Sequence, residues 1–190
     1  MTDPAIGLGQ IVASDPAFDV SAFLKQAGDT FLSVKSGLES RDLVDVAELL
    51  SDDVYDDLRT DVSRLLQRGA IQHYDTLGIS QSSVAAADHS QSGDSITVLF
   101  RAAAIQYLSS EEENSDGSTM PMMPFTEYWT FSRARVDSST PQAPECPTCG
   151  APIDIDTGRI CRYCKTLLPS PRRQVGWTVV SITPAAQNTT

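Results

Sequence analysis

The stretch FTEYWTFSR, from Phe125 to Arg133, alternates with a period of two, as a strand with one buried face does. One face carries three aromatic rings and two charged groups, in the order Phe125, Glu127, Trp129, Phe131 and Arg133. Large rings on one side predict that this strand packs on the core of the fold. Glu127 and Arg133 then form either a polar group inside a pocket or a salt bridge at the sheet edge.

The segments on either side of this strand also have the pattern of strands. The clearest alternation with polar or small residues is that of Ile96, Val98, Phe100, Ala102 and Ala104. Residues 71–90 are ambiguous, but they favour strand around Leu77 and Ile79 and in Val84–Ala87. A last strand is expected at Val175–Ile182, and the polar run SSEEENSDGST indicates a solvated loop between strands. These segments predict an antiparallel sheet.

Ahead of the strands, a first helix is indicated by apolar residues at helical spacing. Its stripe consists of Phe23, Ala27, Phe31, Val34 and Leu38. Asp19 is placed to cap its first turn. Lys35 and Glu39 are four residues apart, and we expect them to pair with each other on the opposite side of the helix.

Two further helices are expected after the first. One covers Leu43–Leu50, and the next is capped by Ser51 and ended by Gly69. The apolar stripe of the latter consists of Val54, Leu58, Val62 and Leu65. Helices followed by antiparallel strands predict an α+β domain, and residues 1–14 are expected to be a flexible tail.

All four cysteines lie in the stretch CPTCGAPIDIDTGRICRYC, as Cys146, Cys149, Cys161 and Cys164. Two Cys-x-x-Cys pairs at this separation predict a tetrahedral zinc site in a zinc ribbon. Two disulfides would need an oxidising compartment, and no signal peptide is visible. Iron on four thiolates stays open, because the ligand type alone does not separate it from zinc. A closed four-thiolate site is structural, so we expect zinc to be a structural cofactor and the ribbon to be a local clasp.

Length and charge limit the classes of function. The chain has 190 residues, 41% of them apolar, which is enough for one domain with a core and a small added module. Its formal charge of −11 argues against nucleic acid as a partner, since such proteins present a basic surface. No run of eighteen apolar residues occurs, so no transmembrane segment is expected in this chain.

The combined pattern resembles the Tim44-like domain family, named after a subunit of the mitochondrial inner-membrane translocase. The matching residues are the Phe18–Phe31 helix, LLSDDVYDDL, FTEYWTFSR and GWTVVSI, with a cysteine ribbon inserted before the last of these. The resemblance implies a nuclear transport factor 2-like cone, in which helices pack on a curved antiparallel sheet. It places this domain at residues 15–135 and 173–183, the ribbon at 141–168 and a second flexible tail at 184–190.

The resemblance also implies a function. It indicates a bacterial, non-enzymatic, membrane-associated module that binds a protein partner or a lipid in an apolar concave pocket. The residues expected to line that pocket are Tyr107, Trp129, Phe131 and Trp177, unless they form an ordinary aromatic core. Peripheral association at the cytoplasmic face of the cell membrane would follow, with the oligomeric state left open and a dimer among the alternatives.

The alternative is an enzyme of the same fold that acts on a small apolar molecule. Such an enzyme needs a convergent acid and base in its pocket. His73 and His89 are the only histidines, and both are expected to be surface groups. No catalytic residues are therefore assigned, and binding is favoured over catalysis.

Overall fold

The computed structural model describes residues 4–110, 120–134, 146, 148–151, 163–164 and 176–185. Within these residues the chain forms helices followed by one antiparallel sheet with the strand order β1-β2-β3-β4. The strands are β1 (Ala70–His89), β2 (Gly93–Ser110), β3 (Met123–Ala134) and β4 (Thr178–Pro184). The predicted α+β class is confirmed, and each strand pairs with the next one along the chain.

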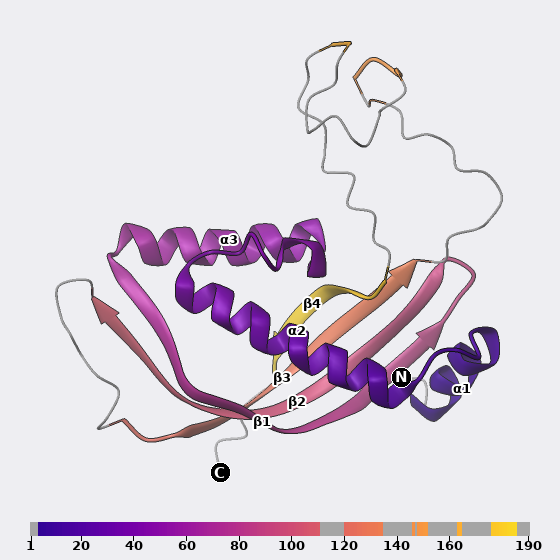
Figure 1. The fold of residues 1–190 in the computed structure, drawn as a ribbon, viewed down its shortest axis with the longest axis horizontal. Helices are drawn as coiled ribbons and strands as arrows, with labels where there is room; N and C mark the ends of the chain where they lie inside the picture. The colour runs from indigo at the N-terminus through magenta and orange to yellow at the C-terminus, as the bar shows by residue number, and fades with distance from the viewer. Residues whose placement is uncertain are drawn as a thin grey trace.

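The sheet is strongly curved along its long strands, and the helices lie on its concave side (Figure 1). β1 carries three register shifts against β2, and such bulges bend a strand and increase its twist. One of the shifts follows Asp75, where Thr76 has a positive φ of 54° that is unusual for a β-branched residue. The ambiguous region 71–90 is therefore a single bent strand.

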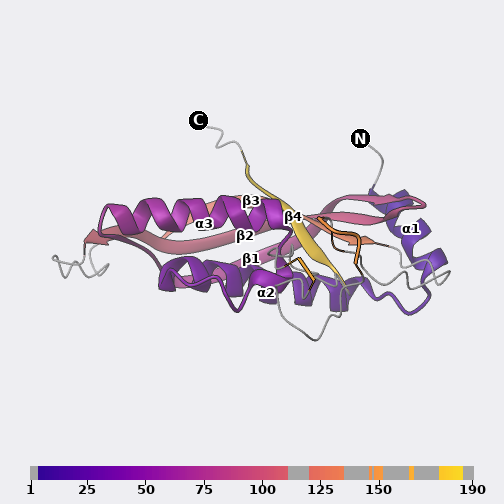
Figure 2. The same cartoon turned by 90° about the horizontal axis from the view of Figure 1, so that it is seen from above.

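Two long helices lie side by side over the sheet (Figure 2). α2 (Val20–Ser40) is capped by Asp19, whose carboxylate accepts from the Ala22 N–H at 2.6 Å. α3 (Asp52–Gln67) is capped by the Ser51 side chain. Both caps confirm the predictions from sequence, and side chains of this kind satisfy N–H groups that have no partner within the helix.

The core lies between α2 and the middle of the sheet. Ring contacts connect Phe31 to Phe100 at 4.8 Å and to Trp129 at 5.1 Å between centroids. A second group joins Phe23 to Phe131 and to Trp177. Each fully buried large apolar side chain contributes about 1.5–3 kcal/mol, so these rings together stabilise the fold substantially. The face predicted for FTEYWTFSR is confirmed, because Trp129 and Phe131 are buried and Tyr128 is exposed.

Three expectations about the ends and turns are wrong. Residues 4–14 are not a tail but form α1 (Pro4–Ser14), which buries Ile11 against the sheet. The helix expected over Leu43–Leu50 is only a short 3-10 turn, η1 (Ala47–Leu49), because the chain then extends to form a parallel bridge to β4. β4 runs to Pro184, one residue into the expected tail of 184–190, of which residues 186–190 lie outside the described part.

Candidate functional site

The centre of the concave face is filled by the side chains of the protein itself. The Lys35 ammonium lies 2.7 Å from Glu127 Oε1, and the Trp129 indole N–H donates to Glu127 Oε2 at 2.9 Å. Lys35 and Glu127 expose only 8% and 15% of their side chains, so this ion pair belongs to the interior. Lys35 therefore does not pair with Glu39 along α2, as the i, i+4 spacing had predicted.

Aromatic rings enclose this buried ion pair. The Lys35 ammonium lies 5.2–5.4 Å from the ring centroids of Phe31, Tyr74 and Phe125, within the range of cation–π attraction. Burial, followed by the nearby carboxylates of Glu127, Glu39 and Asp61, raises the pKa of Tyr74 to about 12. The Tyr74 hydroxyl thus stays neutral at physiological pH, and the centre of the cone offers a packed polar core rather than a binding site.

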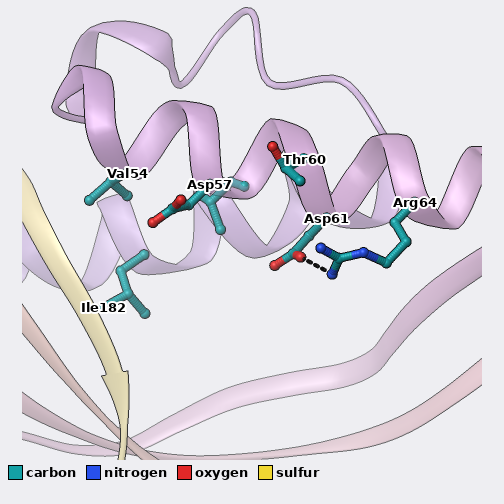
Figure 3. Close-up of a pocket in the computed structure, with 7 residues that line it drawn as sticks. Val54, Asp57, Thr60, Asp61, Arg64 and Ile182 are labelled. Atoms are coloured by element: carbon teal, nitrogen blue, oxygen red, sulfur yellow. Dashed lines mark hydrogen bonds and ion pairs between the residues drawn. The ribbon is translucent and has the colours of Figure 1, made fainter.

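Open space occurs instead between α3 and the sheet. One cavity of about 380 Å³ lies between α3 and β4, and a second of about 280 Å³ lies between α3, α2 and β1. Leu58, Asp61 and Arg64 line both cavities, so we treat them together as the α3 groove. Figure 3 shows Val54 and Asp61 from α3 and Ile182 from β4 around the first cavity.

The α3 groove has apolar walls and a charged rim. Its apolar side chains are Leu38, Val54, Leu58, Leu65 and Ile182. Asp61 accepts from Arg64 at 2.7 Å, and more than half of each side chain is exposed, so this pair is weak and its charges are available to a ligand. Asp57 adds a further acidic group. The groove can therefore hold an apolar chain while polar groups meet charges at the edge.

A second charged cluster lies near α1. Asp94 is 2% exposed, and its carboxylate accepts hydrogen bonds from Arg133 at 2.7 Å and from His89 at 2.6 Å. Arg133 also donates to the carboxylate of Asp15 at 2.8 Å. The Arg133 guanidinium lies over the Trp177 ring, 4.8 Å from its centroid. Glu127 and Arg133 therefore form neither a shared pocket group nor a salt bridge with each other, since each has a partner in a different part of the domain.

Opposing effects act on the charges of this cluster. Burial raises the pKa of Asp94, but the hydrogen bonds and positive charges of Arg133 and His89 outweigh it and hold the pKa below its usual value. Burial likewise lowers the pKa of Arg133, whereas its bonds to Asp94 and Asp15 raise the pKa overall. Both groups are charged at neutral pH, and through Asp15 they fasten the connection between α1 and α2 to the β2–β3 pair.

A third cluster surrounds His73. Its Nδ1 lies 3.2 Å from Glu39 Oε1 on α2, its Nε2 lies 2.8 Å from Ser109 Oγ on β2, and its ring stacks on Tyr107 at 4.5 Å. The Tyr107 hydroxyl in turn donates to Asp75 at 3.1 Å. The expectation that both histidines are plain surface groups is wrong, because each is half-buried and in contact with a carboxylate.

Three of the four cysteines belong to the described residues, and they lie together. The sulfurs of Cys146, Cys149 and Cys164 are within 4.8 Å of one another, and Cys146 Sγ and Cys164 Sγ are 3.6 Å apart. Two sulfurs on one tetrahedral zinc ion lie about 3.8 Å apart, so this donor set fits a metal. Gly150, at φ 68°, closes the first turn and donates to the Cys146 carbonyl at 2.8 Å. Cys161 lies outside the described residues.

The surroundings of Cys146 favour its thiolate, which is the form that binds a metal ion. Burial raises the pKa of Cys146, but the backbone N–H groups of Thr148 and Cys149 point at its sulfur, and the pKa falls below the usual value overall. Metal ligation requires the thiolate, which these backbone bonds favour.

The four aromatic residues expected to line a pocket do not surround one opening. Trp129 and Phe131 are fully buried in the core, so the pocket assignment is wrong for them. Trp177 packs on Phe23 and Arg133, and Tyr107 stacks on His73 at a different part of the sheet. Sequence reasoning missed the α3 groove, although the apolar stripe of α3 beside the aspartates of its first three turns was a signal for it.

Comparison with models of known protein families gives a match. A family model described as Tim44-like domain matches residues 5–142, which include α1 to β3. No curated protein matches the chain. Among the helices that the structure describes, none is long and apolar enough to cross a bilayer. The match stops before the cysteines and β4, so the wider extent expected from the resemblance stays a prediction.

Proposed function

The chain belongs to the Tim44-like domain family, and on that premise we propose that it is a non-enzymatic module that binds a protein partner or a lipid at a membrane surface. The nuclear transport factor 2-like cone of this family agrees with helices packed on a curved antiparallel sheet. The domain would consist of residues 15–135 and 173–183, extended by α1, with the ribbon of 141–168 inserted between β3 and β4.

The observation that carries this proposal is the α3 groove. It is open, and its apolar walls have room for a hydrocarbon chain or for the apolar face of a short helix. The centre of the cone, by contrast, is filled by Lys35, Glu127 and the rings around them. We therefore place the binding site along α3 rather than at Trp129 and Phe131.

The enzyme alternative gains no support from the geometry. An enzyme of this fold would need an acid or a base that faces the bound molecule. Glu127, the carboxylate considered for that role, is held by Lys35 and Trp129 inside the core. The charged groups of the α3 groove are exposed aspartates and arginines, which suit recognition rather than proton transfer.

We expect Leu58→Gln to weaken ligand binding about tenfold or more, because Leu58 lines both cavities and its apolar surface contributes about 1.5–3 kcal/mol when covered. The measurement is sedimentation with vesicles of phosphatidylcholine or of phosphatidylglycerol, in parallel with titration by an amphipathic helical peptide. The net charge of −11 predicts that binding to phosphatidylglycerol does not exceed binding to phosphatidylcholine.

Leu66→Gln is the matched control. Leu66 is on the same helix and is 50% exposed, but it lines neither cavity, so its replacement should leave binding unchanged. Equal losses in both variants would place the ligand on the outer surface of α3. Failure of the wild-type protein to bind either the vesicles or the peptide would contradict the proposed function.

The ribbon is proposed to be a structural zinc clasp. Cys146, Cys149 and Cys164 have the spacing of zinc ligands, and Cys161 would supply the fourth thiolate. Zinc bound there would hold the ribbon folded. Because β3 and β4 pair with each other, both ends of the inserted segment leave from neighbouring strands, as expected for a local module.

The purified protein should contain one zinc ion per chain, as measured by elemental analysis. Cys146→Ser should release the metal, because a serine hydroxyl is a poor zinc ligand and a buried ligand would be lost. Melting of the α+β domain should shift little, since metal binding stabilises mainly the module that provides the ligands. Protein that contains no metal, or that carries two disulfides when its thiols are trapped at cell lysis, would refute the zinc site.

A further inference from the structure

The cluster around His73 brings three metal-ligating side chains together at one point. Glu39 comes from the last turn of α2, and His73 and Asp75 come from the same face of β1. One ligand atom from each lies within 4.8 Å of the others. The three side chains belong neither to the cysteine site nor to the α3 groove, and the proposed binding function does not use them.

The distance between Glu39 and His73 suits two ligands of one bound ion. Two ligand atoms held about 2.1 Å from a metal are about 3.0 Å apart at a right angle and about 3.4 Å apart at the tetrahedral angle. Glu39 Oε1 and His73 Nδ1 are separated by 3.2 Å, between these values. An imidazole with two carboxylates is a donor set that takes Mn²⁺, Fe²⁺ or Zn²⁺ and leaves positions for water.

The neighbours of the cluster hold these ligands in place. Ser109 contacts the far ring nitrogen of His73 at 2.8 Å, and the Tyr107 ring stacks on the imidazole. The Tyr107 hydroxyl donates to one oxygen of Asp75. Metal-bound histidines and carboxylates usually have outer partners of this kind, which fix the ring nitrogen and the oxygen that face the ion.

Among the described residues, no basic side chain other than His73 forms an ion pair with the carboxylates of the cluster. In the part of the chain that the structure describes, neither Glu39 nor Asp75 forms an ion pair with a lysine or an arginine. Glu39 also lies at the C-terminal end of α2, where the helix dipole disfavours a negative charge and where the last turn has no basic residue. When His73 Nε2 donates to Ser109, its Nδ1 and the Glu39 oxygen are two acceptors, and either a proton or a metal ion between them satisfies both.

We infer that Glu39, His73 and Asp75 form a binding site for a single divalent transition-metal ion, which joins the end of α2 to the bent strand β1. Thr76, in its unusual backbone conformation, follows the third ligand directly, and the bulge there turns the strand at the site. The ion would be separate from the zinc of the ribbon, and its ligands are oxygen and nitrogen rather than sulfur.

Manganese tests this site without interference from the cysteines, because Mn²⁺ prefers oxygen and nitrogen ligands over thiolates. The full-length protein, given one equivalent of zinc for its cysteine site and then dialysed free of excess zinc, is titrated with Mn²⁺, and the loss of the free-ion signal is followed by electron paramagnetic resonance. We expect one saturable Mn²⁺ per chain. Glu39→Gln, Asp75→Asn and His73→Gln should each weaken binding about tenfold or more.

Glu48→Gln is the control, because it removes the same charge from an exposed carboxylate that is not part of the cluster. It should bind Mn²⁺ as the wild type does. No saturable binding to wild-type protein would overturn the site and leave Glu39 and His73 as an ordinary ion pair. Equal weakening by Glu39→Gln and Glu48→Gln would also overturn it, since that result means diffuse attraction to an acidic surface. Should a ligand variant fail to fold by circular dichroism, the wild-type stoichiometry and the other two variants still decide.

Discussion

Replacing Lys35 with methionine is expected to lower the free energy of unfolding by about 3–5 kcal/mol, because it leaves the Glu127 carboxylate charged and without its cation inside the core. The Lys35–Glu127 distance of 2.7 Å and the low exposure of both side chains make this the most buried lysine–carboxylate contact in the described part of the chain. The packing around Lys35, with Phe31, Tyr74 and Phe125 close to its ammonium, leaves little room for water to replace it.

The measurement is urea unfolding followed by circular dichroism. Lys25→Met is the matched control on the same helix, since Lys25 is 80% exposed and pairs with the exposed Asp29, so its replacement should change the free energy of unfolding little. The double variant Lys35→Met with Glu127→Gln should lose less free energy of unfolding than the two single variants lose together, because it leaves no buried charge without a partner. Equal small effects of Lys25→Met and Lys35→Met would mean that water reaches the core ion pair.

Asp94→Asn should cost about 2–4 kcal/mol at neutral pH, because Arg133 and His89 lose the buried carboxylate that both of them contact. The pKa of Asp94 is depressed in the folded state, so its contribution is fully present above the ordinary aspartate pKa of about 4 and is lost as the pH falls through the folded value. The difference between wild type and variant should therefore shrink in acid.

Unfolding curves recorded from pH 7 down to the acid range test this sign. Asp88→Asn is the control, because Asp88 is an exposed carboxylate on the same hairpin, and its replacement should cost little at any pH. A cost of Asp94→Asn that stays constant through acid pH would show that Asp94 acts by packing and not by its charge.

The local part of this fold could be predicted from the sequence. Asp19 and Ser51 cap their helices as expected, because a cap depends on residues within one turn. The face of FTEYWTFSR was also predictable, since side chains on a strand alternate whatever the strand packs against. The family resemblance added the cone, which no single segment specifies.

Partners far apart along the chain could not be predicted. Lys35 contacts Glu127, which is 92 residues away, whereas the helical spacing suggested Glu39. Glu39 in turn contacts His73 on β1. Ion-pair rules for helices describe exposed side chains, and they do not apply once Lys35 points at the sheet, four residues after the buried Phe31. The α3 groove and the His73 cluster depend in the same way on how the sheet bends.

The pairing of β3 with β4 has a consequence for the order of folding. Hairpins of short connection join β1, β2 and β3, but 43 residues separate Ala134 from Thr178. Closing a loop of that length costs about 3 kcal/mol of chain entropy before the first β3–β4 bond forms, so β4 should complete the sheet last. A metal that links Cys146 to Cys164 shortens the free chain between β3 and β4 to about 25 residues. This lowers the entropy cost of closing the loop by only about 0.5 kcal/mol. The last strand thus docks at nearly the same rate whether the ribbon holds its ion or not.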